Sequence, residues 1–261
     1  MKKLAFLLFL FTIGFNLYSQ NSQSVYTLEL RRDIAISTLA VCVFVIPFFI
    51  NDDRPAPPIL DRNDVNAFDR WLMFPYNRGM RIASQPLLVI GAASTFVPPL
   101  ILGWGDQRGN LSTWLTYGVM FTQAHLLTFG TKDLIGRNVN RYRPMVYFHD
   151  VEYEGFFFRR SFPSGTTAAA FMQATFLSVA FSQEFPESRW RVPVIIGSHT
   201  LASMVGATRI LSSEHFLTDI LAGAAIGSFY GWLIPTLHRR TENDRVSFIP
   251  TVNGLIVSFR F

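Results

Sequence analysis

The sequence predicts an all-α protein, a six-helix bundle of the membrane type followed by a short β-hairpin, and three observations favour this class. Hydrophobic residues make up 49% of the 261 residues and charged residues only 16%, whereas about 25% of the residues in a typical soluble domain are charged. Six stretches of 17 to 24 residues contain no Asp, Glu, Lys or Arg, and a helix of about 20 residues crosses the hydrocarbon core of a bilayer. The apolar content excludes a disordered chain, and the single cysteine, Cys42, excludes a disulfide framework.

The N-terminus has the order of a secretory signal. Two lysines precede an apolar run from Leu4 to Phe15, and a polar stretch follows. We therefore expect either a cleaved signal peptide over residues 1–19 or an uncleaved signal anchor. Residues 20–32 would link this segment to a helical domain over residues 33–240. In both cases the chain is addressed to a membrane or beyond it.

The six uncharged stretches are the expected helices of the bundle. In chain order they are Ile34–Asn51, Ile82–Gly105, Gly109–Thr131, Ser161–Gln183, Val192–Thr208 and Ile220–His238. The second is the most convincing span, whereas the fourth and fifth carry enough polar residues to fit the buried helices of a soluble bundle equally well. Between the first and second, aromatic residues lie among arginines from Asp52 to Arg81, which predicts either a loop with a short interfacial helix or a solvated loop. The mean hydropathy of +0.25 is modest for a protein in which all six stretches cross a membrane.

The C-terminal residues change character. From Val246 the apolar residues no longer follow helical spacing, and Asn253-Gly254 is typical of a tight turn. Val246–Val252 and Leu255–Phe261 would pair across this turn as a β-hairpin within residues 245–261. Two strands are too few for an outer-membrane barrel, so we expect an appendage of the helical domain.

Polar and charged residues gather in three clusters at the ends of the expected helices. The clusters are Lys132–Pro144 after the third helix, Ser161–Thr167 at the start of the fourth, and Arg209–Asp219 between the fifth and sixth. In an up-and-down bundle, the loop that joins helices three and four lies at the same end as the loop that joins five and six. We therefore expect the three clusters to meet at one face.

The residue types in this combined set suit phosphate chemistry. Arginine binds phosphate oxygens bidentately and lysine supplies a point charge, and a Pro-Ser-Gly turn that opens a helix offers free N–H groups to an anion. His215 and Asp219 are four residues apart, so on one helical turn the carboxylate can fix the tautomer of the imidazole. The other imidazole nitrogen could then attack phosphorus and form a phosphohistidine. Part of the net charge of +5 is thereby assigned to a phosphate site, and nucleic acid is no longer needed to explain it.

With these residues in this order, the sequence resembles the type 2 phosphatidic acid phosphatase superfamily, which also contains lipid-diphosphate phosphatases, secreted acid phosphatases and vanadium haloperoxidases. The resemblance covers residues 52 to 235. The matching residues are Lys132 and Arg143-Pro144 in the first motif, Pro163-Ser164-Gly165 in the second, and Arg209, His215 and Asp219 in the third. The third motif, an arginine, five residues, a histidine, three residues and an aspartate, matches without a gap.

The resemblance implies a role for each matching position. His215 would be the nucleophile and Asp219 its orienting partner. The groups that would hold the phosphoryl oxygens are Lys132, Arg143, Ser164, Gly165 and Arg209. No metal and no other cofactor is expected, because these cations neutralise the phosphate themselves. The implied function is metal-independent hydrolysis of a lipid-linked phosphate or diphosphate, with membrane lipids as the surroundings and no nucleic acid partner.

The resemblance also implies a site at the periplasmic face of a bacterial-type inner membrane. The order of the helices does not fit this directly, because three spans after a cleaved signal, or four with the signal kept as an anchor, would put the site in the cytoplasm. Either one early segment does not cross, or the protein is a soluble periplasmic bundle like the secreted acid phosphatases. The apolar second segment favours the membrane form.

Two departures from the family pattern bear on the chemistry. In the first motif ten residues separate Lys132 from Arg143, where the family has six. The four extra residues equal about one helical turn, about 6 Å along the axis. If they are helical, Lys132 lies one turn too deep. If they form a loop, Lys132 keeps its place, and in either case Arg137 or Arg141 could take over a contact.

The second departure is Thr166, which stands where the family has the histidine that protonates the leaving oxygen. A threonine hydroxyl is a poor general acid, and loss of general acid catalysis typically costs about 10²–10⁴-fold. A phosphate leaving from a diphosphate needs the proton far less than an alkoxide does, so the substitution indicates either a diphosphate substrate or a catalytically impaired protein that only binds phosphate or lipid headgroups. A vanadium haloperoxidase would need the missing histidine as well.

His149 could replace the acid or be a surface histidine, and His125, His199 and His238 are expected to be non-catalytic.

Overall fold

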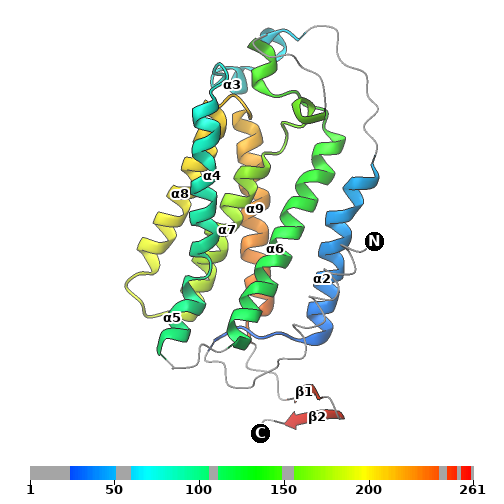
Figure 1. Ribbon diagram of the computed structural model, residues 1–261, viewed down its shortest axis with the longest axis vertical. Coiled ribbons are helices and arrows are strands. Elements are labelled where there is room, and N and C mark those ends of the chain that lie inside the picture. The colour runs from blue at the N-terminus through cyan, green and yellow to red at the C-terminus, as the bar shows by residue number, and fades with distance from the viewer. Residues whose placement is uncertain are drawn as a thin grey trace.

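The chain folds into an elongated up-and-down bundle of helices (Figure 1). The computed structural model describes residues 24–50, 60–105, 111–148, 156–240, 246–251 and 254–259. The helices are α2 (Leu30–Val45), α3 (Ala67–Arg70), α4 (Arg78–Ser94), α5 (Val97–Gly105), α6 (Leu111–Asn138), α7 (Gly165–Glu184), α8 (Arg191–Leu211) and α9 (Leu217–His238). The predicted all-α class is confirmed, while the expected signal segment over residues 1–19 lies outside the described residues.

The second expected helix is not continuous. α4 ends at Ser94 and α5 begins at Val97, so the expected segment Ile82–Gly105 is interrupted by two residues. Proline has no N–H to donate and is therefore unfavourable in a helix interior, although α4 and α9 each contain one. It fits the first turn of a new helix, and Pro98 and Pro99 occupy the first turn of α5. The segment that the sequence presented as the most convincing span is therefore two shorter helices.

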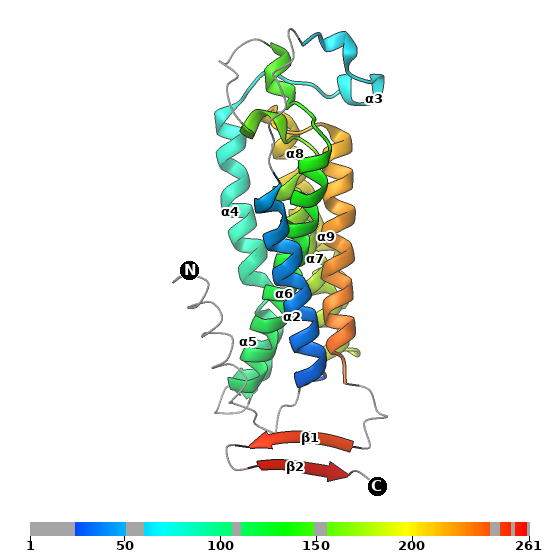
Figure 2. The same cartoon turned by 90° about the vertical axis from the view of Figure 1, so that its right-hand side faces the viewer.

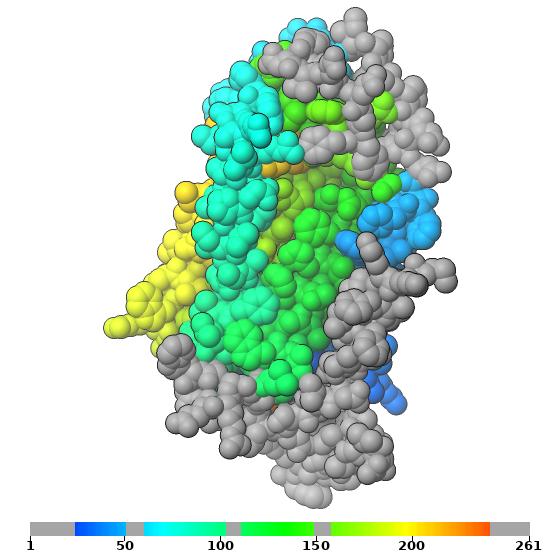
Figure 3. Space-filling view, viewed as in Figure 1, coloured from blue at the N-terminus to red at the C-terminus, as the bar shows by residue number. Residues whose placement is uncertain are grey.

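Among the described residues, three helical segments are long and apolar enough to cross a membrane: Leu30–Phe49, which is α2 with the 3-10 turn that follows it, α8 and α9. Large apolar side chains on the outer faces of the bundle are more than half exposed, for example Leu39 on α2, Val89 on α4 and Ile196 on α8. Extended apolar surface of this kind fits lipid better than water, and the chain is a membrane protein. In the space-filling view, α4 and α6 cover most of the face turned to the viewer, between α8 at one edge and α2 at the other (Figure 3).

The closest pair of helices is α7 and α9, which lie at the centre of the bundle (Figure 1). Three glycines spaced four residues apart on α9, Gly223, Gly227 and Gly231, face the backbone of α7. A Cβ on Gly223 would lie 2.5 Å from the carbonyl oxygen of Ser164, and a Cβ on Gly227 would overlap that of Ala168. Small residues at this spacing let two helix backbones approach closely. The stripe therefore fixes the second turn of α9 beside the start of α7.

The up-and-down course brings the end of α6, the start of α7, the end of α8 and the start of α9 to one end of the bundle (Figures 1 and 2). The short helix α3 lies over the same end, which is where the three polar clusters were expected to meet. Two antiparallel strands lie beyond the opposite end, β1 (Val246–Thr251) and β2 (Gly254–Phe259), with Val246 opposite Phe259 (Figure 2). The remaining residues of the two strands expected there, 252, 260 and 261, lie outside the described residues, as does residue 253.

Candidate active site

His215 lies in the turn between α8 and α9 and is buried, with 3% of its side chain exposed. Its Nδ1 lies 2.7 Å from the carbonyl oxygen of Ser161, and its Nε2 lies 3.5 Å from Nη1 of Arg143. A carbonyl oxygen can only accept, so Nδ1 carries the hydrogen and donates it. The lone pair of the neutral imidazole is then on Nε2, which faces the arginine. This is the arrangement that a nitrogen nucleophile requires.

Asp219 supports His215 in a different way from the one expected. Its carboxylate lies 3.7 Å from Nδ1 of His215, which is beyond hydrogen-bond length, and the Ser161 carbonyl takes the bond that the sequence assigned to Asp219. The carboxylate instead accepts hydrogen bonds from the Ser161 hydroxyl, from the backbone N–H of Phe216 at 2.8 Å and from Arg141 at 2.5 Å. Asp219 therefore fixes the backbone directly after His215 and the side chain of Ser161, and it leaves a negative charge near the ring.

A second layer of polar contacts joins this carboxylate to α3. The guanidinium of Arg141 lies between Asp219 and Asp69, with 2.5 Å to each carboxylate, and packs over the ring of Phe216. Asp69 also accepts a hydrogen bond from the backbone N–H of Thr218 at 2.9 Å. Burial alone would raise the pKa of Asp69, but this bond and those from Asn66, Thr218 and Arg141 side chains outweigh it, so the pKa lies below its ordinary value. The sequence did not single out Asp69, because no spacing links it to the third motif.

Three guanidinium groups converge beside His215. Arg143 and Arg209 are both buried, as expected for phosphate-binding groups, and Arg209 donates to the hydroxyl of Ser84 at 3.1 Å. The third is Arg81, in the first turn of α4. All three form ion pairs with the carboxylate of Glu214. The sequence analysis missed Arg81, Ser84 and Glu214, although Glu214 stands inside the third motif, directly before the histidine.

The start of α7 brings in the residues of the second motif. Ser164 caps the helix, with its hydroxyl accepting from the backbone N–H of Thr167 at 3.4 Å, and its own N–H donates to the carbonyl of Asp219 at 3.0 Å. Thr166 is half-buried, and within the described part of the chain its hydroxyl has no hydrogen-bond partner. N–H groups in the first turn of a helix can bind an anion, and the anion site expected at this turn stays a prediction.

Lys132 lies next to this helix start in spite of the insertion in the first motif. A Cβ on Gly165 would lie 2.9 Å from Cδ and 3.4 Å from Nζ of Lys132, and the ammonium group pairs with Asp133 at 2.5 Å. α6 continues as a helix to Asn138, so part of the insertion is helical. Of the two arginines that could take over a contact, Arg141 reaches Asp219, as described above.

Arg137 instead donates to the carbonyl of Ile50 at 2.5 Å, which is outside this cluster.

Burial and charge together set the state of the nucleophile. Burial, assisted by the positive charge of Arg143 and opposed by Asp219, lowers the pKa of His215 to about 4. Burial likewise lowers the pKa of Arg143 to about 10. At neutral pH the imidazole is therefore neutral and the guanidinium is charged, which is the combination needed for attack on an anionic phosphoryl group.

The other described histidines lie away from this cluster. His125 lies between the rings of Phe121 and Phe129 on α6, His199 bonds to its own helix α8, and His238 pairs with Asp33 near the opposite end of the bundle. His149 lies outside the described residues.

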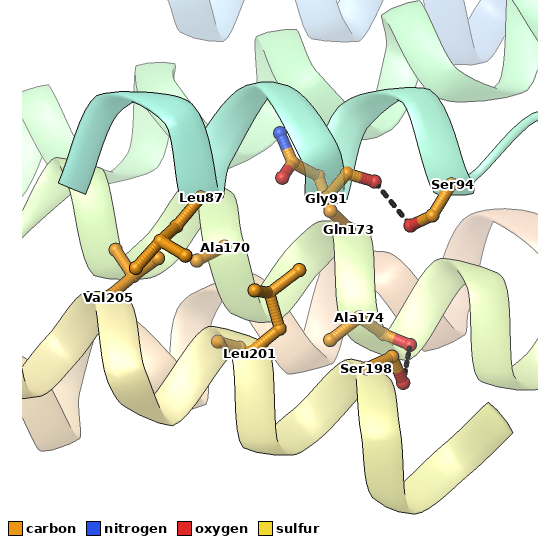
Figure 4. Close-up of a pocket in the computed structure, with 10 residues that line it drawn as sticks. Leu87, Gly91, Ser94, Ala170, Gln173, Ala174, Ser198, Leu201 and Val205 are labelled. Carbon is orange, nitrogen blue, oxygen red and sulfur yellow. Dashed lines mark hydrogen bonds between the residues drawn. The ribbon is translucent and has the colours of Figure 1, made fainter. Parts of the chain in front are cut away.

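A small hollow among α4, α7 and α8 contains none of the motif residues (Figure 4). It is lined by small and apolar side chains together with Gln173, Ser94 and Ser198.

A family model described as the PAP2 superfamily matches residues 113–242. Among curated proteins, the chain is 37% identical over 73 residues to a lipid A 1-phosphatase of Porphyromonas gingivalis, which covers 28% of this chain and 15% of that protein. It is 33% identical over 116 residues to a lipid A 1-phosphatase of Rhizobium etli, 41% of this chain and 44% of that protein. It is 26% identical over 161 residues to phosphatidylglycerophosphatase B of Bacillus subtilis, 60% of this chain and 74% of that protein. The matches to the two lipid A 1-phosphatases thus span less than half of their length.

Proposed function

The chain belongs to the PAP2 superfamily, and on that premise we propose that it is a metal-independent phosphatase that hydrolyses a lipid-linked phosphate or diphosphate through a phosphohistidine on His215. The observation that carries the proposal is the state of His215: Nδ1 donates to the Ser161 carbonyl at 2.7 Å, and Nε2 faces Arg143 at 3.5 Å. A buried neutral imidazole with its free nitrogen directed at a cluster of arginines is suited to attack an anion that those arginines bind.

The reaction would run in two steps. In the first, Nε2 of His215 forms a bond to phosphorus while the bond from phosphorus to the leaving oxygen breaks. Arg143 and Arg209 hold the other phosphoryl oxygens, and the Asp219 carboxylate, 3.7 Å from the ring, offsets the positive charge that develops on the phosphorylated imidazole. In the second step water attacks phosphorus, the N–P bond breaks, and orthophosphate and neutral His215 are regenerated.

The position of the site supports a lipid as the substrate. His215 lies at one end of a bundle with three helices suited to cross a membrane, so a phosphate headgroup at the membrane surface can reach it while the acyl or prenyl chain stays in lipid. The names of the relatives, lipid A 1-phosphatase and phosphatidylglycerophosphatase B, agree with a lipid phosphate. We propose that the site faces the periplasm from a bacterial-type inner membrane.

Thr166 favours a diphosphate over a monoester. Its hydroxyl cannot protonate an alkoxide near neutral pH, whereas a phosphate leaving from a diphosphate needs no such proton. Thr166 also supports a second candidate function, a catalytically impaired protein that binds a phosphate headgroup without hydrolysing it.

A panel of phosphate-release measurements separates these functions. Native protein, His215→Ala and Thr166→His are compared on a polyprenyl diphosphate and on a phosphatidic acid. We expect native protein, and not His215→Ala, to release phosphate from the diphosphate; equal release by both would contradict the nucleophile. Thr166→His should raise monoester hydrolysis by on the order of 10²-fold and change diphosphate hydrolysis little. If native protein releases nothing from either lipid and Thr166→His does, the binding function replaces the phosphatase.

A further inference from the structure

Glu214 is a fully buried carboxylate inside the candidate phosphate site, and the phosphatase chemistry does not use it. It stands directly before His215, in the turn between α8 and α9. Its ion-pair partners are Arg81 at 3.1 Å, Arg143 at 3.9 Å and Arg209, which come from α4, from the segment after α6 and from the end of α8. None of the carboxylate is exposed to solvent.

The carboxylate uses the same groups that a phosphoryl group would need. Carboxylate and phosphate oxygens both bind the planar fork of a guanidinium, and they compete for the same N–H donors. Arg143 and Arg209 are the two arginines assigned to the phosphoryl oxygens. A phosphate close to Nε2 of His215 must therefore share these two arginines with Glu214 or take them from it.

We propose that Glu214 is an internal counter-anion that holds the arginine cluster in the unliganded protein, and that the phosphoryl group of the substrate displaces it from Arg143 and Arg209. This proposal rests on the phosphatase function proposed above. It concerns which anion pairs with the arginine cluster before substrate binds and how the phosphoryl group replaces that anion. Buried cations without an anion are strongly destabilising, so an arginine cluster as enclosed as this one needs a negative charge of its own until the substrate arrives.

The three arginines differ in their exposure to solvent, and this difference indicates which of them the displaced carboxylate can still pair with. The side chains of Arg143 and Arg209 are 10% and 6% exposed, whereas that of Arg81 is 47% exposed. The carboxylate of Glu214 can therefore remain paired with Arg81 at the mouth of the site while phosphate takes the two inner arginines.

The backbone around Glu214 is fixed while this happens. The N–H groups of Glu214 and His215 both donate to the carbonyl oxygen of Arg209, at 3.2 Å and 3.3 Å. The displacement thus needs only a change in the side-chain torsions of Glu214, and the nucleophile stays in place.

The test is the affinity of the full-length protein in detergent for inorganic phosphate, measured by isothermal titration calorimetry with native protein, Glu214→Gln and Glu187→Gln. Glu187 is an exposed glutamate in the turn before α8 and serves as the matched control. Because Gln keeps the shape of the side chain and removes the competing charge, we expect Glu214→Gln to bind phosphate at least about tenfold more tightly than native protein, and Glu187→Gln to bind like native protein. Equal or weaker binding by Glu214→Gln, or no binding by any of the proteins, would overturn the proposal.

A second variant covers the case in which Glu214→Gln does not fold without its charge. Glu214→Asp keeps the carboxylate but shortens the side chain by one methylene, so it pairs less well with three arginines at once. We expect a smaller gain, about threefold in phosphate affinity, and an affinity equal to or below that of native protein would overturn the proposal. Recovery of folded Glu214→Gln only in buffers containing phosphate would support it, since phosphate then supplies the missing anion.

The outcome is separable from that of the phosphatase proposal, because binding of inorganic phosphate requires no turnover. Tighter binding by Glu214→Gln together with no phosphate release from any lipid would refute the phosphatase and leave the counter-anion in place. Phosphate release that depends on His215, together with unchanged binding by Glu214→Gln, would do the reverse. In an active protein, Glu214→Gln should also show about tenfold stronger inhibition by the product phosphate, which a purely structural role would not produce.

Discussion

In the described part of the chain, two buried histidines each lie close to an aspartate, one near each end of α9, and the two pairs have opposite arrangements. At the far end, Nδ1 of His238 lies 2.8 Å from the carbonyl oxygen of Ile234, and its Nε2 lies 2.9 Å from Asp33. At the site end, Nδ1 of His215 also bonds a carbonyl oxygen, but Nε2 faces a guanidinium at 3.5 Å. The first ring has an acceptor at both nitrogens, whereas the second has one nitrogen left for chemistry.

The difference shows how a reactive histidine is distinguished from a structural one in the same fold. Both rings are buried and both lie close to a carboxylate. What differs is whether the carboxylate contacts the ring. Asp33 lies 2.9 Å from Nε2 of His238 and also binds Arg32 and the backbone N–H of Glu29. Asp219 binds the backbone N–H of Phe216 and neighbouring side chains and stays 3.7 Å from the ring of His215. In the reactive pair, the carboxylate of Asp219 positions the residues around His215 and leaves Nε2 of the imidazole free to react.

The largest expected effect comes from removing each histidine in turn. His215→Ala should lower the rate of phosphate release by on the order of 10⁴-fold or more, because loss of a nucleophile removes the covalent route. His238→Ala should leave the rate per folded molecule within about threefold and lower the stability of the protein by roughly 2–3 kcal/mol, because the buried Asp33 then loses one of its partners and keeps Arg32 and the backbone N–H of Glu29. Phosphate release and thermal unfolding in detergent measure the two effects.

Loss of activity in His238→Ala together with activity kept in His215→Ala would contradict the assignment of His215 as the reactive histidine and His238 as the structural one. Circular dichroism of both variants, showing the helical content of native protein, is the control that makes the rates comparable.

The two aspartates give the next largest contrast. Asp219→Asn should lower kcat by on the order of 10²–10⁴-fold with little change in KM, because an amide in that place cannot accept from Ser161, Phe216 and Arg141 together. Asp33→Asn should change thermal stability and not kcat. Steady-state kinetics on the polyprenyl diphosphate measure both parameters. A fall in kcat of the same size in both variants would contradict the assignment of a catalytic role to Asp219 and a purely structural role to Asp33.

The glycine stripe that connects the two ends allows a matched test of position. A Cβ would lie 2.5 Å from an α7 carbonyl oxygen at both Gly223 and Gly231, so Gly223→Ala and Gly231→Ala should lose similar stability, about 1–3 kcal/mol. Only Gly223 faces Ser164, at the site. We therefore expect kcat to fall by roughly 10²-fold in Gly223→Ala, because a shift of about 1 Å at a reacting group has that effect, and to stay near native in Gly231→Ala. Equal kcat values for the two variants would show that the stripe does not position the site.

The sequence was sufficient to predict the class of fold and which motif residues lie together, while their roles stay predictions. Uncharged stretches of helical length predicted the helices, and the spacing of Arg209, His215 and Asp219 predicted the residues that the structure brings together. The interruption of the second helix was missed although its signal, Pro98-Pro99, is present in the sequence. The spacing of Gly223, Gly227 and Gly231 was also readable as a close helix contact.

Other parts of the site could not be predicted from the sequence, for physical reasons. The partner of His215 is the backbone carbonyl of Ser161, and a carbonyl oxygen is present at every residue, so it leaves no mark in a sequence. Arg81 and Glu214 meet only because α4 packs beside the end of α8. That contact is set by the tertiary packing of helices far apart in the chain, and no local spacing encodes it.

The smallest expected effect is a change in the pKa of His215, which tests how much the charge of Arg143 contributes to the difference between the two histidines. Burial is the main reason that the pKa of His215 is lowered to about 4, and the charge of Arg143 is the second. Arg143→Gln removes the second cause and leaves the first, so the pKa should rise by about one unit and remain below the ordinary value of 6.5. NMR of protein with labelled histidine, assigned with His215→Gln, measures the shift, and Arg32→Gln at the far end is the control that should leave it unchanged.

The sign of this shift has a consequence for stability. Because the pKa of His215 is lower in the folded than in the unfolded protein, the unfolded state takes up the proton first, and the folded state loses stability as the pH falls from about 6.5 to about 4. In Arg143→Gln the pH range over which stability is lost should end at a higher pH, because the pKa of His215 in the folded variant is higher. A His215 pKa that stays at its native value or falls further in Arg143→Gln would show that the guanidinium does not act on the ring, and the contrast between the two histidines would then rest on burial and hydrogen bonding alone.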